Sequence, residues 1–244
     1  MITGGSWSEE MKILAIDSSS LVAAAALVED DILISEYTLN YKKTHSQTLM
    51  GMIDEILKRT ETAPSELGAL AFTKGPGSFT GLRIGAASIK GLSAALDIPV
   101  IGVPTLEAMA YNFWGSDKLI CPMLDARRNQ VYAGMYSFGE KGLEIIMDQS
   151  ALSAEEFAQR INAEGREAVL LGDGLPVFLK TAGSSLRVPY MAAPASHNRQ
   201  RAASVAVLAG DYYKRGLYKD ENTELCYLRL SQAERERAER LGSV

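Results

Sequence analysis

Apolar and polar positions divide the first half of the chain into short strands and two helices. Three apolar runs come first, and the links between them are so short that the runs should pair as an antiparallel meander. A longer stretch follows in which Leu49, Met52, Ile53, Ile56 and Leu57 recur at helical spacing. The predicted elements of this half are strands at 12–20, 22–28, 32–39, 68–73 and 99–103, and helices at 44–60 and 79–97.

The second half repeats that order of elements without repeating the residues. Its predicted elements are strands at 119–124, 130–138, 143–148, 168–171 and 187–190, and helices at 153–162, 175–182 and 196–216. Three strands followed by alternating helices and strands, in both halves, favour an α/β protein with a duplicated ribonuclease H-like fold, the actin-like architecture also found in sugar kinases and Hsp70. A plain doubly wound sheet would alternate strands and helices from its start.

Helix starts are marked by a recurring pattern. A Ser or Thr followed three residues later by Glu or Gln can form a capping box, in which each side chain binds a backbone N–H that the helix leaves free. Such pairs are Thr44 with Gln47, Ser153 with Glu156, and Ser231 with Glu234. Ser196 can cap the last long helix, and Gly216 suits its end. The charged stretch after Ser231 predicts a short solvated helix.

The order of elements divides the chain into four parts. Residues 1–10 are expected to be a flexible extension, with Met11 as the true start. The first ribonuclease H-like domain is predicted at 11–107, completed by a C-terminal helix at 197–216. The second is predicted at 108–196, and a tail with the short charged helix at 217–244.

Composition and charge exclude several classes of protein. The 244 residues are 47% hydrophobic and 23% charged, which is typical of a globular protein with a sizeable core. The formal net charge of −5 argues against a chain that binds nucleic acid by itself, because such binding is driven by positive side chains that neutralise phosphates. No apolar run reaches about 18 residues, the length of a membrane span, and the polar start is no signal peptide. Cys121 and Cys226 form neither a disulfide framework nor a metal pattern, so we expect a cytoplasmic protein.

A glycine-rich stretch lies between a predicted strand and a predicted helix, where phosphate-binding loops are often built. It reads TKGPGSFTGLRIG, and we name its core, Gly75-Pro76-Gly77-Ser78, the glycine loop. A P-loop would need a lysine that is absent until Lys90, and a dinucleotide fingerprint would need its third glycine one place before Gly81. A nucleophile elbow would need glycines in place of Pro76 and Thr80. Two interpretations stay open: backbone amides that hold an anion at the helix start, or a tight turn.

The helix after this loop has one face that is nearly bare backbone. Gly81 and Gly85 lie four residues apart and Ser88 three further, so they share a face. Together with Gly91, the glycines forgo roughly 2–3 kcal/mol of helix stability relative to alanine. This cost indicates close packing on that face, either against the chain's own sheet or against another chain.

Several short motifs resemble those of one bacterial protein family. The motifs are Ile16-Asp17-Ser18-Ser19, Thr44-His45-Ser46, the run from Gly75 to Gly85, Asp125-Ala126-Arg127 with Val131-Tyr132, and Tyr227-Leu228-Arg229. They resemble the TsaB family, also called YeaZ, over about 11–229. The run from Gly75 to Gly85 is the most specific of them.

The resemblance implies both a fold and a function. The family has the duplicated actin-like fold and acts in making threonylcarbamoyladenosine next to the anticodon of tRNAs that read codons starting with A. TsaB is its non-catalytic subunit: it binds the catalytic subunit TsaD as a heterodimer, the ATPase TsaE joins the assembly, and tRNA is reached only through the complex. The resemblance therefore implies no catalytic residue, cofactor or metal here, and leaves open whether the chain alone is a homodimer.

The residues themselves favour the non-catalytic interpretation. Nucleotide-using proteins of this fold place a glycine in the turn between their first two strands, whereas residues 17–21 contain none. TsaD carries paired histidines on one helix as metal ligands, but His45 and His197 lie far apart here, and His45 is expected to be a helix-start residue. Asp17 is expected to bind the neighbouring serine turn. The alternative is an ATP-dependent kinase-like enzyme or a peptidase of the same fold, for which no convincing catalytic set is present.

The helices at 44–60 and 79–97 are the predicted docking surface for TsaD or for a second copy. The predicted interface residues are His45, Leu49, Met52, Ile53, Ile56, Gly81, Gly85 and Ile89. The apolar members would anchor the partner, and the two glycines would permit close contact. We therefore expect Ile53→Glu to give a folded protein that no longer binds TsaD.

Overall fold

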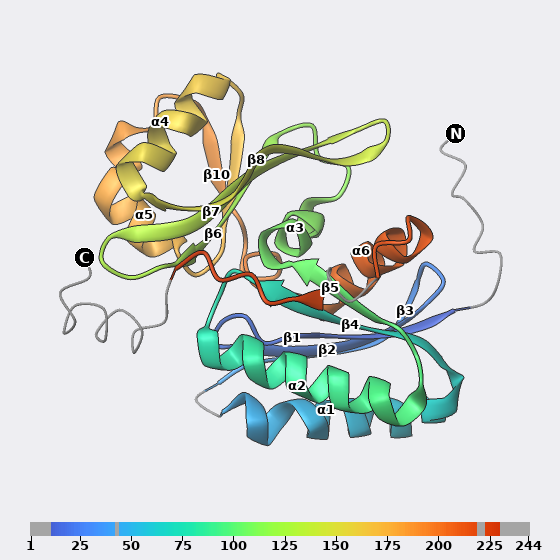
Figure 1. The fold of residues 1–244 in the computed structure, drawn as a ribbon. Coiled ribbons are helices and arrows are strands. Elements are labelled where there is room, and N and C mark those ends of the chain that lie inside the picture. The colour runs from blue at the N-terminus through green and yellow to red at the C-terminus, as the bar shows by residue number, and fades with distance from the viewer. Residues whose placement is uncertain (1–10, 42–43, 219–222, 230–244) are drawn as a thin grey trace.

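The chain forms two lobes, each built on a five-stranded sheet (Figure 1). The structure is a computed structural model that describes residues 11–41, 44–218 and 223–229. The first sheet has the order β3-β2-β1-β4-β5, in which β1 to β3 pair antiparallel and β4 and β5 run parallel to β1. Its strands are β1 (Lys12–Asp17), β2 (Val22–Glu29), β3 (Ile32–Asn40), β4 (Leu67–Gly75) and β5 (Val100–Pro104).

Helices cover both faces of the first sheet. They are α1 (His45–Arg59), α2 (Phe79–Leu96) and α6 (Ala202–Lys214). α1 and α2 lie side by side on one face, and α6 lies on the other (Figure 1). Alternate residues of β1 serve the two faces: Leu14 and Ile16 pack toward α1 and α2, whereas Ile13 and Ala15 pack toward α6. Because both faces are covered, the strand is apolar throughout rather than alternating.

The second lobe repeats this plan on a sheet of order β10-β9-β6-β7-β8. Its strands are β6 (Leu119–Asp125), β7 (Gln130–Gly139), β8 (Gly142–Ser153), β9 (Ala168–Leu171) and β10 (Tyr190–Ala192). Helices α4 (Ala154–Glu164) and α5 (Leu175–Ala182) cover one face of this sheet. Helix α3 (Thr105–Ala110) covers the other face and also contacts the first sheet. The 3-10 helices are η1 (Pro64–Glu66), η2 (Tyr111–Phe113) and η3 (Gly183–Ser185).

This topology confirms the predicted α/β class and the duplicated ribonuclease H-like fold. Each half runs as three antiparallel strands followed by helices that alternate with parallel strands. The helix α6, from the end of the chain, packs against the sheet built by the beginning of the chain. Within the described ranges, no helix is long and apolar enough to cross a membrane.

Four elements differ clearly from the sequence-based expectation. The pattern misses α3, because five of its six residues are buried and a helix that is covered all round shows no apolar stripe. The last helix begins at Ala202 and not at Ser196, since Asn112 Nδ2 donates to the carbonyls of His197 at 3.0 Å and Arg199 at 2.8 Å and holds that segment in a loop. β10 covers 190–192 instead of 187–190, and β8 continues to 153 instead of 148.

The helix caps are confirmed in part. Ser153 caps α4, and its Oγ accepts a hydrogen bond from Glu156 N at 3.1 Å. Thr44 stands at the predicted cap position of α1, but its side chain makes no capping bond and its Oγ1 lies 3.2 Å from Ser46 Oγ instead. The third predicted pair at 231–234 and the extension at 1–10 lie outside the described residues.

Candidate functional site

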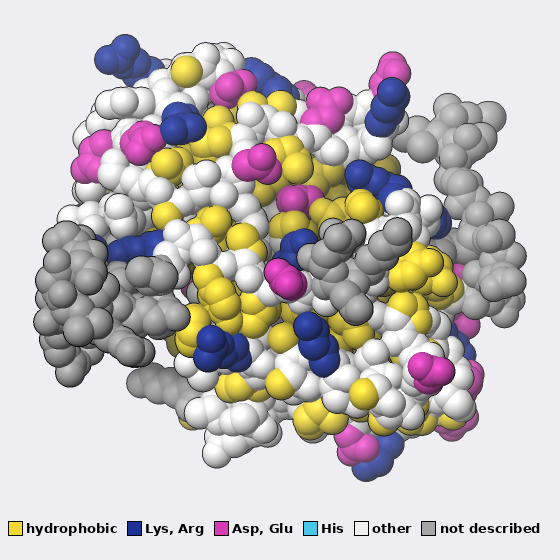
Figure 2. All heavy atoms as spheres, viewed as in Figure 1, with side chains coloured by type: hydrophobic (Ala, Val, Ile, Leu, Met, Phe, Trp, Pro, Cys, Tyr) yellow, Lys and Arg dark blue, Asp and Glu magenta, His cyan; other side chains and the backbone are white. Residues whose placement is uncertain are grey.

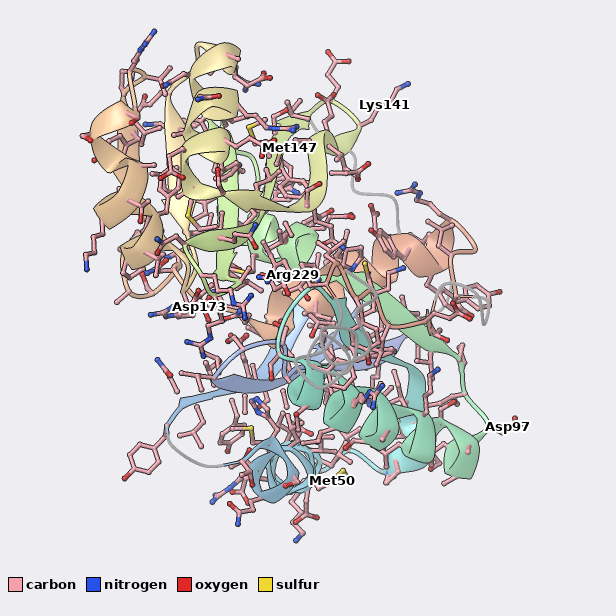
Figure 3. The ribbon with its side chains drawn as sticks, turned by 60° about the vertical axis from the view of Figure 1, so that its left-hand side comes forward. Met50, Asp97, Lys141, Met147, Asp173 and Arg229 are labelled. Atoms are coloured by element: carbon pink, nitrogen blue, oxygen red, sulfur yellow. The ribbon has the colours of Figure 1, made fainter. Side chains whose placement is uncertain are left out.

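A cleft of about 880 Å³ lies between the two lobes. The first lobe lines it with the turn at 17–21, which we name the serine turn, with the glycine loop and with the start of α2. The second lobe contributes the end of β6, the turn at 126–129 and Asp173, and the segment at 223–229, which we name the strap, adds a further side. Figure 3 shows Asp173 and Arg229 at the junction of the lobes.

The glycine loop and the bare face of α2 pack against the serine turn. Ser78 N donates to Ser19 O at 2.6 Å, and Ser18 Oγ donates to Gly81 O at 2.9 Å. A Cβ added at Gly77 would overlap Ser19 O, and one added at Gly81 would overlap Ser18 O. A Cβ added at Gly85 would overlap Ser18 Oγ. The glycines are therefore needed for close packing, as the sequence indicated, and the neighbour that requires them is the chain's own turn.

Several polar groups of the serine turn are engaged internally, although Asp17 Oδ2 is buried without a hydrogen-bond partner among the described residues. Asp17 Oδ1 accepts hydrogen bonds from Ser19 N at 2.8 Å and Ser19 Oγ at 2.7 Å, and Ser20 Oγ accepts one from Val22 N at 3.1 Å. This confirms the expected role of Asp17 in holding the turn. Burial raises the pKa of Asp17 above its ordinary value, and the hydrogen bonds from Ser19 offset part of that rise.

His45 ties the start of α1 to the same turn. Its Nε2 lies 2.7 Å from Ser20 O, so Nε2 carries the proton and donates to the carbonyl. The ring also packs beside Gly81, where an added Cβ would lie 3.2 Å from His45 Cδ2. Among the described residues, no group of three or more His, Cys, Asp and Glu side chains is placed to hold a metal ion.

Most of the predicted interface residues lie in the core of the first lobe. Leu49, Ile53, Ile56 and Ile89 are at most 2% exposed and pack between α1, α2 and the sheet. The prediction that they anchor a partner is wrong for this reason: helical periodicity identifies a buried face, and here the chain's own sheet buries it. Met52 is half-buried against the same core. Gly81 and Gly85 are buried against the serine turn and so are not free for a partner, whereas His45 is half-buried and lines the cleft, so its place in an interface stays a prediction.

The surface that α1 and α2 leave open consists of other residues. Exposed positions on the two helices include Met50, Gly51, Ala87, Gly91 and Ala94, which we name the helix-pair face. Met50, labelled on α1 in Figure 3, has an exposed apolar side chain, and its exposed fraction is 45%. A Cβ added at Gly51 or Gly91 would meet no described atom within 4 Å. Side chains that are small or absent leave these positions low, beside the exposed long side chains of Arg83 and Lys90 on α2.

The corresponding turn of the second lobe is exposed and carries charge. We name residues 126–129, Ala-Arg-Arg-Asn, the arginine turn. Its last three residues have left-handed φ angles of 65°, 56° and 58°. It is closed by hydrogen bonds from Ala126 N to Gln130 O at 3.0 Å and from Gln130 N to Arg127 O at 3.1 Å.

Two carboxylates support the arginine turn from inside the cleft. Asp125 Oδ1 accepts a hydrogen bond from Arg127 N at 2.7 Å, and Asp125 Oδ2 lies 3.3 Å from Arg127 Nη1. Asp173 Oδ1 accepts one from Asp125 N at 3.0 Å. Burial raises the pKa of Asp173, against the effect of the hydrogen bond that it accepts.

The strap joins both lobes along the cleft. Cys226 N donates to Lys74 O in the first lobe at 2.7 Å, and Arg229 Nη1 donates to Ala126 O in the second at 2.5 Å. Between them, the Tyr227 ring lies 4.8 Å from the Phe79 ring at the start of α2. The motif at 227–229 signalled these residues by resemblance alone, and only the fold brings them to the cleft.

The architecture defines the class of protein: an actin-like, duplicated ribonuclease H-like fold with a cleft between its two lobes. A family model described as "TsaD: tRNA N6-adenosine threonylcarbamoyltransferase" matches residues 33–221. The solved structure of YeaZ from Pseudomonas aeruginosa superposes with a TM-score of 0.76 and 26% identity, covering 89% of this chain and 100% of that one.

Two relatives are both named tRNA threonylcarbamoyladenosine biosynthesis protein TsaB. The Bacillus subtilis tRNA threonylcarbamoyladenosine biosynthesis protein TsaB is 35% identical over 230 residues, which cover 92% of this chain and 96% of that protein. The Escherichia coli protein of that name is 32% identical over 195 residues, covering 77% of this chain and 84% of the relative. The chain belongs to the TsaB family, as the motif resemblance implied.

Proposed function

We propose that this chain is a non-catalytic assembly subunit that binds the catalytic subunit TsaD and, with it, the ATPase TsaE. A role in the biosynthesis of threonylcarbamoyladenosine in tRNA follows from membership of the TsaB family. The modified adenosine is the one next to the anticodon of tRNAs that read codons starting with A. The chain acts in the cytoplasm and works on tRNA as part of the complex.

The closed serine turn is the observation that carries the non-catalytic assignment. To hold a phosphate, the turn between the first two strands would have to offer free backbone amides. Here Ser19 N is bonded to Asp17, and Val22 N is bonded to Ser20. The carbonyl of Ser19 accepts Ser78 N, and α2 is pressed onto the turn at Gly81. This packing supports a turn that serves as structure rather than as a phosphate cradle.

The helix-pair face supports docking through α1 and α2. Met50 offers an exposed apolar side chain, and Gly51 and Gly91 leave room beside it for a partner helix. Charged pairs on α1 border this surface, with Lys58 Nζ 2.6 Å from Asp54 Oδ2 and Arg59 Nε 2.7 Å from Glu55 Oε1. An apolar, low centre with a charged rim is the usual composition of a protein interface.

The docking proposal is tested by adding bulk to this face. Gly51→Arg and Gly91→Arg each place a long side chain in open space, so the chain should fold while co-purification with TsaD is lost. Gln159→Arg adds the same side chain at an exposed position of α4 and should leave binding intact. Ile53→Glu is unsuitable as a test, because a carboxylate at a position that is 2% exposed should unfold the lobe.

Two outcomes would contradict different parts of the proposal. Failure of the unmodified chain to bind TsaD, or formation of modified tRNA by TsaD and TsaE without this chain, would remove the assembly role. Retained binding by both folded arginine variants would remove the helix-pair face from the interface. Sedimentation of the chain alone, with and without Gly91→Arg, shows whether a second copy uses the same face.

A further inference from the structure

Three arginine side chains converge on one turn beside the cleft. Arg127 and Arg128 belong to the arginine turn and are exposed, and the side chain of Arg127 is 84% accessible. Arg229 reaches the same turn from the strap and binds Ala126 O. Among the described residues, neither Arg128 nor Arg229 forms an ion pair, so their charge is not neutralised within this part of the chain. The cluster therefore suits a ligand with more than one negative charge.

The acids nearby neutralise only part of this cluster, since Asp125 pairs with Arg127 alone among the described residues. Asp125 faces Arg127 and is bonded to the backbone of the turn, and Asp173 is mostly buried beneath it. Both carboxylates thus shape the turn from inside, while the guanidinium groups of Arg127 and Arg128 extend outward. Backbone strain at successive non-glycine residues is most often retained where it positions a functional group.

An aromatic stack faces the cluster across the cleft. Tyr227 is 39% exposed and packs on Phe79, over which the Arg83 guanidinium lies at 3.9 Å. Arg83 Nε also donates to Tyr227 Oη at 3.1 Å, which fixes the ring. Figure 2 shows hydrophobic side chains gathered where the lobes meet, with Lys and Arg side chains beside them. Guanidinium groups next to an exposed ring are the two elements with which proteins hold single-stranded nucleic acid.

We infer that the arginine turn and the Tyr227 ring bind a single-stranded segment of RNA. Phosphates lie against Arg127, Arg128 and Arg229, and a base stacks on Tyr227. This inference rests on the proposed function, because it names what the chain itself contributes to substrate binding by the complex. The net charge of −5 makes the isolated chain a weak RNA binder. The contact is therefore one part of a larger surface.

The geometry favours RNA over a free nucleoside triphosphate. A triphosphate would have to be wrapped by the turns of both lobes, but Ser19 N and the carbonyls of Ser19 and Ser20 in the serine turn are already hydrogen-bonded. The groups that remain for a ligand are the charged side chains of the second lobe and the aromatic ring on the strap, and they do not enclose a ligand from both lobes. A strand of RNA needs no enclosure, since its phosphates can meet the arginines in succession.

The first test uses the complex of the full chain with TsaD and a labelled, unmodified RNA stem-loop. Arg127→Glu combined with Arg128→Glu should lower RNA affinity by about tenfold and reduce the slope of log K against log salt by about two. Lys141→Glu combined with Lys180→Glu makes the same change in charge at exposed sites; Lys141 lies at the far tip of the β7–β8 hairpin (Figure 3). Equal losses in both double variants, or no loss in either, would overturn the inference.

A second pair of variants tests the ring. Tyr227→Phe keeps the stacking surface and should keep RNA affinity, whereas Tyr227→Ala should weaken it by roughly tenfold, the effect of one lost base stack. Ultraviolet crosslinking should join the RNA to the strap in the unmodified complex, and excess ATP should not displace it. Displacement of the RNA by ATP would overturn the assignment. Co-purification with TsaD is scored on every variant, so a failed complex is distinguished from a failed RNA contact.

Discussion

The serine turn and the arginine turn occupy the same place in the two halves of the fold, yet they differ in burial, charge and backbone conformation. Each follows the first strand of its sheet and leads into the second. Four of the five residues of the serine turn are buried and Leu21 is 80% exposed; the turn lacks arginine and is bonded to α2. The arginine turn is exposed, strained and charged. One plan of strands and helices has thus given one turn that is part of the core and one that is available to a ligand.

The difference follows from what packs on each turn. In the first lobe α2 is long, and its glycines let it lie directly on the serine turn. In the second lobe, the helix after β9 is only eight residues long, and the arginine turn meets the strap instead. A turn pressed by a helix must satisfy its polar groups internally, whereas a turn at the surface can extend side chains toward solvent and partners.

The largest effect is expected when the close packing of α2 on the serine turn in the first lobe is disturbed. Gly81→Ala places a Cβ against Ser18 O, so the serine turn or α2 must shift, and we expect a loss of about 2–3 kcal/mol in the free energy of unfolding. Urea denaturation followed by circular dichroism measures it. Gly91→Ala, in the same helix, meets open space and should instead gain about 0.5–1 kcal/mol. A loss of the same size at both positions would mean that helix propensity, and not contact with the turn, sets the effect.

The fold was accessible from the sequence because its strands are apolar runs and its helices carry stripes. What the pattern could not give was α3, whose residues are covered by both sheets, and the start of α6, which is set by Asn112 from elsewhere in the chain. Periodicity reports how much of a helix is covered. It does not report whether the covering residues belong to the same chain, so the stripe that contains Leu49 and Ile53 predicts a partner surface where the structure has core.

The candidate site was less accessible for a related reason. The glycine spacing predicted close packing on α2, and the structure confirms it, but the serine turn that fills the space is far away in sequence. The arginine turn left a weaker signal, since Arg127 appears only as part of a family motif and nothing in the sequence singles out Arg128. Their left-handed backbone and the contact with Arg229 exist only in the folded chain.

A smaller effect is expected from the acid that holds the serine turn. Burial raises the folded-state pKa of Asp17 above its unfolded value, so the stability linked to this group is fully present below the unfolded pKa and is lost as pH rises through the folded pKa. Asp17→Asn removes that titration. The stability of the unmodified chain relative to Asp17→Asn should therefore fall above about pH 4, by at most about 1.4 kcal/mol per pH unit.

Denaturant midpoints measured for both proteins from acid to neutral pH give this difference directly. The other carboxyls with raised pKa, Glu107 and Asp173, are present in both proteins and cancel. A relative stability that stays constant or rises with pH would show that Asp17 is held ionised in the folded state. The serine turn would then contain a charge, and its contrast with the arginine turn would be smaller than the packing suggests.

The smallest effect sharpens the comparison at the backbone. Arg128 has a φ of 56°, which alanine resists and glycine accepts, so Arg128→Gly should be more stable than Arg128→Ala by about 1 kcal/mol. Ser19 is not among the residues with positive φ. Ser19→Gly should therefore be less stable than Ser19→Ala, by roughly 0.5–1 kcal/mol. Thermal or urea unfolding of the four variants measures both differences. Within each pair the same functional side chain is lost, so the difference in stability between the glycine and the alanine variant reports the backbone conformation. Opposite signs of this difference in the two turns would separate a strained surface turn from a relaxed internal one. Equal signs would contradict the left-handed geometry on which the arginine turn depends.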